Sequence, residues 1–472
     1  MGASNRQPCM SETPITRNLC FASHAFPTHG TVGILSQTYR SGFDSVPRAS
    51  TYARSMWPFH RNPSHRIRSS GPYWLLRNGT GDARPALETA LECDIAIIGA
   101  GITGVLIADS LVATGQRIVI LESRDVALGS TSATTALLQY EIDTHLTELV
   151  AQLGADAAAR AYLACAASFD SLERRFPELL KASNYQRVAS LYLAHEAAAV
   201  PTLRAELAAR RAVGFHCDWL EEGELVQRFG CRRPGAILSA LGAQIDPVRF
   251  TQGLVAGLER HGVRLFARSR VSGITENGAR LRVATEGGAV VDAAHVVIAA
   301  GFESLDFLAK PLAGKIDIDN TYALVTEPLP DRSRALTMPL IWESARPYLY
   351  MRGSPDGRLI LGGADVPFKN PTARDALLSR QIRRLASNYR DLFGEDLPPI
   401  AHAWGGSFAS TPDGLPFIGR APGMHPALLF ALCYGGNGIT YSVHAGEMIR
   451  AAVEGRAHEL DDIFGFARTK VS

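Results

Sequence analysis

The sequence lacks the features that mark several specialised classes of protein. Its 48 basic and 46 acidic residues leave a formal net charge of +2, too small to indicate binding to nucleic acid or to an anionic membrane. The seven cysteines are widely spaced and form no Cys-x-x-Cys pair, so we expect free thiols, no disulfide framework and no metal site. No apolar run approaches the roughly 18 residues that a membrane-spanning helix needs. The 472 residues, 46% of them hydrophobic, are typical of a globular enzyme with two packed domains.

The first 70 residues are poor in acids. Glu12 and Asp44 are set against eight Arg, eleven Ser and four His, and no periodicity is sustained, which predicts a disordered leader over 1–70. Leaders rich in Arg and Ser also occur as organellar transit peptides. The other explanation is an overlong start with translation beginning at Met56, which we favour because no amphipathic helix is evident. We therefore expect a cytoplasmic protein, with an organellar matrix as the alternative if residues 1–70 are a transit peptide.

The rest of the chain is organised around residues 94–122. A short apolar run, 94–98, is typical of a buried strand, and Gly99, Gly101 and Gly104 follow it with the G-x-G-x-x-G spacing of a dinucleotide fingerprint. The three glycines permit a tight turn, the approach of a pyrophosphate and close helix–strand packing. A second strand ends at Glu122, whose carboxylate can accept hydrogen bonds from a ribose. The stretch predicts a dinucleotide site in an α/β sheet.

Three later segments fit the same site. The hydroxyls of Ser130, Thr131 and Ser132 follow the second strand and can donate hydrogen bonds to a pyrophosphate. A buried strand over 296–300 ends at Gly301 and can rejoin the nucleotide-binding sheet. Near the end, a strand over 427–433 meets glycines at 435, 436 and 438, and the helix after them can point its N-terminus at an anionic group.

Between these segments the pattern predicts a second domain. Turns at 276–278 and 286–288 indicate a β-meander, and strands at 348–352 and 358–362 indicate a hairpin. One helix should begin at Asp246-Pro247, and another should run from Thr372, with Asp375 near a capping-box position, to about Phe393. Asp143 or Thr144 can cap a third helix. We expect a nucleotide-binding domain (71–182, 241–309 and 403–455), a substrate domain (183–240 and 310–402) and a C-terminal tail (456–472).

Taken together, the motifs resemble the FAD-dependent D-amino acid oxidase superfamily. They are IAIIGAGITG with Glu122, GSTSATTA, VVIAAG, TPDGLPFIG and GGNGITYS, in that order over about 71–455. Within the superfamily the chain is most similar to the gamma-glutamylputrescine oxidoreductases, which share its W-x-G-x-F segment and G-x-T-Y helix start. The resemblance implies an α/β fold, in which a Rossmann-like FAD-binding domain is interleaved with an α+β substrate domain built on an antiparallel sheet.

The resemblance also implies how the cofactor is held. FAD would bind in an extended conformation, with the fingerprint glycines and Glu122 at its adenosine and pyrophosphate. Val271 would contact the adenine, and Gly301 would lie near the pyrophosphate. The flavin ring would face Gly436, Asn437, Gly438 and Ile439. The link should be non-covalent, because Gly406 stands where sarcosine oxidases carry the flavin-bonded cysteine.

The expected chemistry is oxidation of the C–N bond of a small-molecule amine by hydride transfer to flavin N5, with oxygen or another electron acceptor. The alternative is an amino-acid oxidase or dehydrogenase, of the D-amino acid or glycine type, that passes electrons to a quinone or a partner. A flavoprotein without catalysis and an NAD enzyme are disfavoured by the retained glycine segments. Candidate pocket residues are Tyr350, Arg352 and His402, and Tyr348 shares a strand face with Tyr350.

The substrate prediction rests on an absence. Glycine oxidase-like members hold the substrate carboxylate with an arginine before the D-G-x-P segment, and Phe408 stands in the matching place here. An apolar side chain would leave a carboxylate desolvated and unpaired. We therefore expect poor activity on glycine, sarcosine and small D-amino acids, unless Arg352 supplies the missing cation from the substrate domain.

Overall fold

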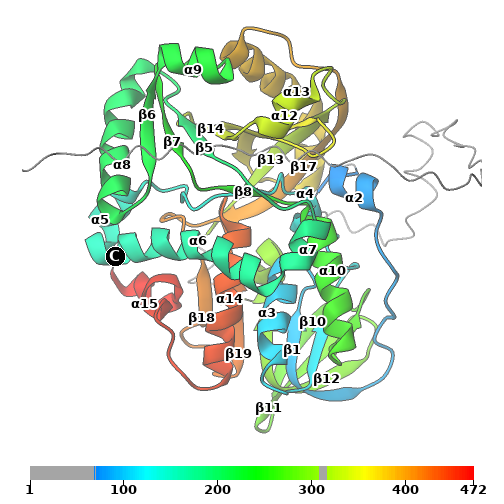
Figure 1. Ribbon diagram of the computed structural model, residues 1–472. Coiled ribbons are helices and arrows are strands. Elements are labelled where there is room, and N and C mark those ends of the chain that lie inside the picture. The colour runs from blue at the N-terminus through cyan, green and yellow to red at the C-terminus, as the bar shows by residue number, and fades with distance from the viewer. Residues whose placement is uncertain (1–67, 70, 308–315, 472) are drawn as a thin grey trace, which may run out of the picture. The chain divides into compact units, whose positions relative to one another are not determined.

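The computed structural model describes residues 68–69, 71–307 and 316–471 (Figure 1). The leader predicted for 1–70 lies outside these residues, except for Arg68 and Ser69. Ser69 belongs to the folded part: its hydroxyl accepts a hydrogen bond from Gly405 N at 2.8 Å, and its own N–H donates to Gly405 O at 2.9 Å. Among the described helices, none is long and apolar enough to span a membrane.

The nucleotide-binding sheet has a parallel centre and an antiparallel margin. Its strands are β1 (Leu91–Ile98), β2 (Ile118–Leu121), β9 (Arg264–Phe266), β10 (Val271–Asn277), β11 (Arg280–Thr285), β12 (Val290–Ile298), β18 (Phe417–Arg420) and β19 (Leu428–Leu432). Strands β9, β2, β1, β12 and β19 run parallel in that order. The first half of β12 also pairs with β11 of the predicted meander. The prediction that the 296–301 strand rejoins this sheet is confirmed.

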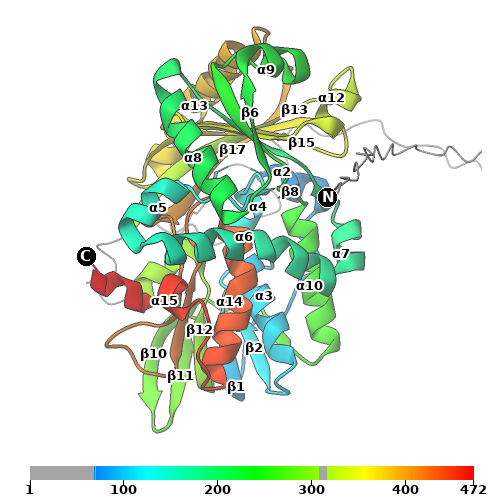
Figure 2. The same cartoon turned by 60° about the vertical axis from the view of Figure 1, so that its left-hand side comes forward.

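Both faces of this sheet are buried, as the continuous apolar strands predict. On β1, Ile95 and Ile97 pack toward helices, whereas Ala96 and Ile98 pack into the core on the other face. The helix that follows the glycine turn, α3 (Ile102–Val112), lies between α14 (Gly438–Val453) and α10 (Pro247–Arg260), and α6 (Ala155–Arg175) packs on α14 (Figure 2). Helix α3 therefore lies at the centre of this layer, next to the glycine turn.

The substrate sheet is antiparallel except where β14 pairs with β5. In spatial order its strands are β17 (Ile400–Ser410), β13 (Asp317–Thr326), β16 (Leu359–Pro367), β15 (Leu349–Gly353), β14 (Leu340–Glu343), β5 (Ser190–Leu193), β7 (Gly235–Ser239) and β6 (Cys217–Glu221). Helix α13 (Pro371–Phe393) packs against β13, β16 and β17, and α8 (Val200–Val213) packs against β6 and β7. The two helices pack on opposite faces of the sheet, and near β14 and β15 the face that carries α8 contributes to the candidate site.

Short elements connect the two sheets. A small sheet pairs β8 (Ala243–Gln244) with β3 (Leu137–Leu138) and β4 (Gln186–Arg187). The other described elements are α2 (Tyr73–Asn78), α4 (Ser130–Ala133), α5 (Leu146–Leu153), α7 (Pro177–Ala182), η2 (Ala197–Ala199), α9 (Glu222–Phe229), η3 (Gly301–Phe307), α12 (Arg332–Thr337), α15 (Asp461–Phe464) and η4 (Phe466–Val471). The chain crosses between the sheets several times, which agrees with the predicted interleaving.

Several local predictions are confirmed, whereas the predicted N-terminal caps of two helices, α13 and α5, are wrong. Helix α10 begins at Pro247, and the Asp246 carboxylate accepts from Arg249 N at 3.0 Å. Strands β15 and β16 form the predicted hairpin. Helix α13 begins one residue earlier than predicted, because Asn370 caps it by accepting from Ala373 N. Neither Asp143 nor Thr144 caps α5, whose N-cap position is His145 without a side-chain bond.

One of the expected domain limits crosses a structural element, and the expected tail contacts the rest of the described fold. The limit at residue 403 falls inside β17, which pairs with β13 of the substrate sheet along its length. The expected tail is packed against the body of the protein: Ile463 and Phe464 are buried, and Arg468 Nε lies 2.7 Å from an oxygen of Asp413. The pattern could not show this because the segment is short and its apolar residues have no partner nearby in sequence.

Candidate functional site

Two positions of the first glycine turn leave no room for a side chain. Gly99 has φ +114°, and a Cβ there would lie 2.5 Å from Ala299 O, on the neighbouring strand. A Cβ on Gly104 would lie 2.0 Å from Gly99 O, which is closer than any non-bonded contact. The predicted roles of these two glycines, a tight turn and close packing of α3, are therefore explained by the backbone geometry.

Glu122 ties the end of β2 to this turn. Its carboxylate accepts hydrogen bonds from Ala100 N at 2.8 Å and from Arg124 N at 2.7 Å. The residue is 8% exposed, yet it lines the cavity described below. Each carboxylate oxygen has two lone pairs, so these bonds leave acceptor capacity for a ribose. The same side chain shapes the turn and faces the ligand site.

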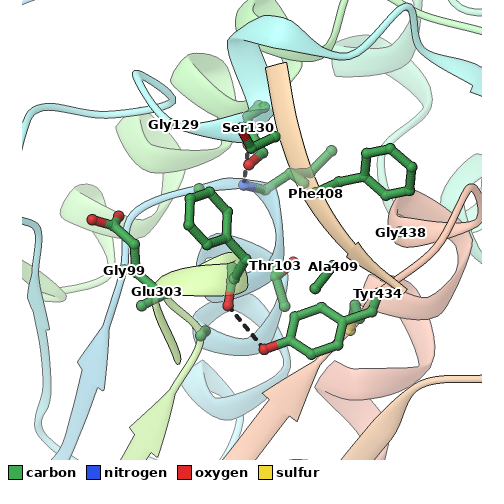
Figure 3. Close-up of a pocket in the computed structure, with 18 of the residues that line it drawn as sticks. Gly99, Thr103, Gly129, Ser130, Glu303, Phe408, Ala409, Tyr434 and Gly438 are labelled. Carbon is green, nitrogen blue, oxygen red and sulfur yellow. Dashed lines mark hydrogen bonds between the residues drawn. The ribbon is translucent and has the colours of Figure 1, made fainter. Parts of the chain in front are cut away.

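A cavity of about 870 Å³ extends from this turn to the substrate sheet (Figure 3). At one end lie Val271 and a paired group of charges. Arg124 Nη1 lies 2.8 Å from Glu303 Oε2, and Arg270 Nη2 lies 3.4 Å from Glu303 Oε1. The sequence analysis did not find this group, because its members come from three separate segments and no motif marks them.

The hydroxyl segment after β2 forms the short helix α4 beside the turn. Thr131 Oγ1 accepts a hydrogen bond from Ile102 N at 3.0 Å, the first N–H of α3. Ser130 lines the cavity (Figure 3). Ser132 does not: it is fully buried, and its hydroxyl donates to Gly129 O at 2.8 Å. Two of the three predicted hydroxyl residues thus face the cavity.

The second glycine turn lies across the cavity at the start of α14. Gly436 N donates to Asp143 Oδ2 at 2.9 Å. The Asn437 amide nitrogen donates to Gln139 O and Glu141 O, each at 2.9 Å. Gly438 begins the helix, and a Cβ there would lie 3.2 Å from Cys433 O. The turn is therefore fastened to the 139–143 segment, which carries the chain from the nucleotide-binding sheet toward α5.

Most of the predicted cofactor residues are brought to this one cavity. Those that line it are Gly99, Gly101, Glu122, Ser130, Thr131, Val271, Gly301, Gly436, Asn437, Gly438 and Ile439. Gly104 and Ser132 are the two that do not. Gly104 allows α3 to pack closely on the turn, as the fingerprint predicts, and the Ser132 hydroxyl bonds to Gly129 O within its own loop.

The structure separates the three predicted pocket residues. Tyr350 lines the cavity and its hydroxyl lies 3.0 Å from Thr321 Oγ1. Arg352 does not line the cavity: it is 1% exposed, donates to Ala136 O and Ile245 O, and lies over the Trp74 ring of α2. His402 is also absent from the described lining. It is six residues before Phe408 on β17, about 20 Å along an extended strand.

The side chains at the substrate end come from alternate residues of the 137–143 segment and from the substrate sheet. Leu137, Gln139, Glu141 and Asp143 line the cavity, whereas the residues between them are buried in the core. This alternation of polar and apolar residues is visible in the sequence and could have been used. From the substrate sheet come Thr321, Trp342, Tyr348, Tyr350, Asp365 and Phe408.

Several hydrogen-bond atoms at this end have no partner among the described residues. They are Gln139 Nε2, both carboxylate oxygens of Glu141, and Asp365 Oδ1. Tyr348 is satisfied, since its hydroxyl donates to Asp143 Oδ1 at 3.1 Å. Burial, together with the nearby Asp143 and Asp319 carboxylates, raises the pKa of Asp365 to about 7. A carboxyl in this position can change its charge near neutral pH.

A family model described as FAD dependent oxidoreductase matches residues 94–452, which include both glycine turns and the whole cavity lining. The chain belongs to this family of FAD-dependent oxidoreductases. It is therefore an oxidoreductase that depends on FAD. The predicted family and the predicted fold class are confirmed.

Curated relatives of this oxidoreductase cover most of its length. Gamma-glutamylputrescine oxidoreductase of Escherichia coli (strain K12) is 24% identical over 381 residues, covering 79% of this chain and 87% of that protein. Glycine oxidase of Bacillus licheniformis is 25% identical, covering 79% of this chain and 96% of that protein. The solved structure of glycine oxidase from Geobacillus kaustophilus matches with a TM-score of 0.64 at 20% identity, covering 80% of this chain and 99% of that one. At that identity the likeness concerns the fold.

The residues of the cavity fit FAD. The first glycine turn offers backbone N–H groups and the N-terminus of α3 to a pyrophosphate, and Glu122 offers a carboxylate to a ribose. The N-terminus of α14 faces the middle of the cavity with its partial positive charge, which suits a flavin ring that gains negative charge on reduction. A cavity of about 870 Å³ that extends from the first glycine turn to the substrate sheet has room for a dinucleotide and for a small substrate at the far end.

Proposed function

We propose that the enzyme oxidises the C–N bond of an amine whose reacting carbon lies away from any carboxylate. The observation that carries the proposal is the absence of lysine and arginine from the substrate end among the described lining residues. Phe408 lies where related oxidases carry an arginine, and Arg352, the alternative cation, is engaged by backbone carbonyls outside the cavity. A carboxylate at this end would be desolvated without a cationic partner, at a cost of several kcal/mol.

The reaction converts an amine into an imine: the carbon next to nitrogen loses a hydride and the nitrogen loses a proton. FAD, when bound, supplies the hydride acceptor at N5. The protein binds and orients the amine between the second glycine turn and the substrate sheet, and excludes water from it. Phe408 and the rings of Tyr348 and Tyr350, with centroids 5.5 Å apart, provide apolar surface for an alkyl chain.

Anaerobic flavin reduction tests the proposal. The holoenzyme is mixed with n-butylamine, 1,4-diaminobutane and gamma-glutamylputrescine, and separately with glycine, sarcosine and D-alanine, and bleaching of the flavin is followed by stopped flow. We expect the amines to reduce the flavin faster than the amino acids. A clear preference for free amino acids would overturn the proposal in favour of amino acid oxidation. Hydrogen peroxide formation under air then distinguishes oxygen from a quinone or partner as the electron acceptor.

We also propose that FAD is bound without a covalent link. Gly406 lies on the cavity wall at the position where sarcosine oxidases carry a cysteine. Cys433 is the one cysteine among the described lining residues, and burial raises the pKa of its thiol to about 12, so it stays protonated and a poor nucleophile. After acid precipitation the yellow colour should remain in the supernatant. Flavin retained in the protein pellet would contradict this.

A further inference from the structure

The substrate end contains a negatively charged recess. We define the acidic recess by the carboxylates of Glu141, Asp143 and Asp365 and the rings of Trp342, Tyr348 and Tyr350, all of which line the cavity. The two cations nearest to it do not line it. Arg346 is exposed and donates to Asp143 O at 3.0 Å, and Arg210 is buried behind Glu141.

Arg210 neutralises only part of the charge of the recess. Its Nε lies 2.8 Å from Glu206 Oε1, and its Nη1 lies 3.6 Å from Glu141 Oε1, so one guanidinium is shared by two carboxylates. Glu141 is 3% exposed, and neither of its oxygens has a hydrogen-bond partner among the described residues. Asp365 Oδ1 is also unpartnered, and no described cation pairs with it. Negative charge therefore exceeds positive charge around the recess.

Buried carboxylates without hydrogen bonds are costly unless a ligand pairs with them. A primary ammonium has three N–H donors and is the complement of such a site. Aromatic walls add to this fit, because the faces of tyrosine and tryptophan rings attract cations and pack against alkyl chains. The Trp342 ring is held in place by stacking on Tyr192, with centroids 3.6 Å apart. Thus charge and shape both select a ligand that carries a cation on an alkyl chain.

We propose that the acidic recess binds the second ammonium of a diamine or polyamine, so that the enzyme selects dications over monoamines. This inference rests on the proposed amine oxidation and specifies its substrate class. The reacting amine lies toward the second glycine turn, and the alkyl chain places the distal ammonium between Asp365, Glu141 and Asp143. Those three carboxylates thus determine specificity rather than take part in the bond changes.

Binding to the chemically reduced holoenzyme tests the inference without turnover. The dissociation constants of 1,4-diaminobutane and n-butylamine are measured by titration calorimetry after reduction with dithionite. We expect 1,4-diaminobutane to bind about ten- to a hundredfold more tightly, the usual worth of one charge-assisted contact. Asp365→Asn, which keeps the shape of the side chain, should reduce this ratio toward one. Retained flavin absorbance and an unchanged melting temperature report that the variant is folded.

Asp317→Asn is the matched control, because it removes a carboxylate from an exposed position on the same sheet, outside the described lining. It should keep the wild-type ratio. Equal affinities of the two amines in the wild type, or a ratio that Asp365→Asn leaves unchanged, would overturn the inference. If monoamines reduce the flavin as well as diamines do, the proposed function stands and this inference fails. If only amino acids reduce the flavin, the proposed function fails and takes the inference with it.

Discussion

The two ends of the cavity differ in how their polar groups are satisfied. At the first glycine turn they bond to the protein itself: Glu122 accepts from two backbone N–H groups, and Thr131 accepts from Ile102 N. At the substrate end, atoms of Gln139, Glu141 and Asp365 have no partner among the described residues. The cofactor end is preorganised by local backbone geometry, whereas the substrate end leaves side-chain atoms unpartnered, and we propose that a ligand pairs with them.

The strongest test of the cofactor end is Gly104→Ala. A Cβ there would lie 2.0 Å from Gly99 O, a backbone atom of the turn between β1 and α3. Overpacking of this kind typically costs about 1–3 kcal/mol, and more where the backbone must move. We therefore expect the free energy of unfolding to fall by about 3 kcal/mol or more. Chemical denaturation of the apoprotein, followed by circular dichroism, measures it.

Gly257→Ala is the control for helix composition. Gly257 also lies in a helix, α10, but a Cβ there meets only the tip of Arg260 at 3.8 Å. Alanine is favoured over glycine in helices by about 1 kcal/mol, so this variant should be as stable as the wild type or more stable. Equal losses for the two substitutions would show that Gly104 is not the close-contact point of the turn.

Glu122→Ala should have the next largest effect. It removes the acceptors of Ala100 N and Arg124 N and the acceptor offered to the ribose. Charge-assisted hydrogen bonds are worth about 1.5–3 kcal/mol, so FAD should bind roughly ten- to a hundredfold more weakly. Fluorescence titration of the apoprotein with FAD measures the dissociation constant. Glu122→Gln keeps one acceptor and should lose less; an unchanged constant in Glu122→Ala would count against the ribose role.

The same contrast explains what could be predicted from the sequence. The cofactor end was predictable because its determinants are local: Gly99, Gly101 and Gly104 lie within six residues, and Glu122 directly follows the next strand. The return of the 296–301 strand to the nucleotide-binding sheet was predictable from an apolar run that ends in glycine, and the structure pairs this strand with β1. In each case the conformation depends on residues that are close in the sequence, so the sequence pattern alone is enough to predict it.

Arg352 shows why the residues of the substrate end were harder to predict from the sequence. It lies on the same strand face as Tyr350, as alternation predicts, but two residues farther along β15 the face is covered by α2. Trp74 of that helix and the carbonyls of Ala136 and Ile245 take up the guanidinium. The residues near Arg352 in the sequence do not indicate that Trp74, nearly 280 residues earlier in the chain, packs over this side chain. The acidic recess is likewise assembled from segments that are distant in the chain.

The titration of Asp365 predicts a pH dependence at the substrate end. Burial and the Asp143 and Asp319 carboxylates raise its pKa to about 7, while Thr321 and Arg346 oppose the rise, and Tyr348 and Tyr350 line the same recess. Asp365 is therefore mostly neutral at pH 6 and mostly charged at pH 8. The ratio of 1,4-diaminobutane to n-butylamine affinity should rise about tenfold over this interval, since ionisation is about tenfold suppressed one unit below the pKa.

The ratio is the useful quantity because titration of the reacting amine affects both compounds equally. It is measured on the reduced holoenzyme at each pH. Asp365→Asn should abolish the rise, and Asp317→Asn should keep it. A rise that persists in Asp365→Asn would assign the titration to another group of the recess.

The smallest effect is expected at Ser69, near the start of the described residues. Ser69 exchanges two hydrogen bonds with Gly405 on β17, whose later residues Gly406–Ala409 line the cavity. Ser69→Ala removes the bond from Gly405 N, so the free energy of unfolding should fall by about 1 kcal/mol, the net worth of one such bond. A chain that begins at Met56 retains Ser69 and should match the full chain in unfolding free energy and FAD affinity. Loss of FAD binding on that truncation would show that the first 55 residues take part in the fold, contrary to the disorder that their composition predicts.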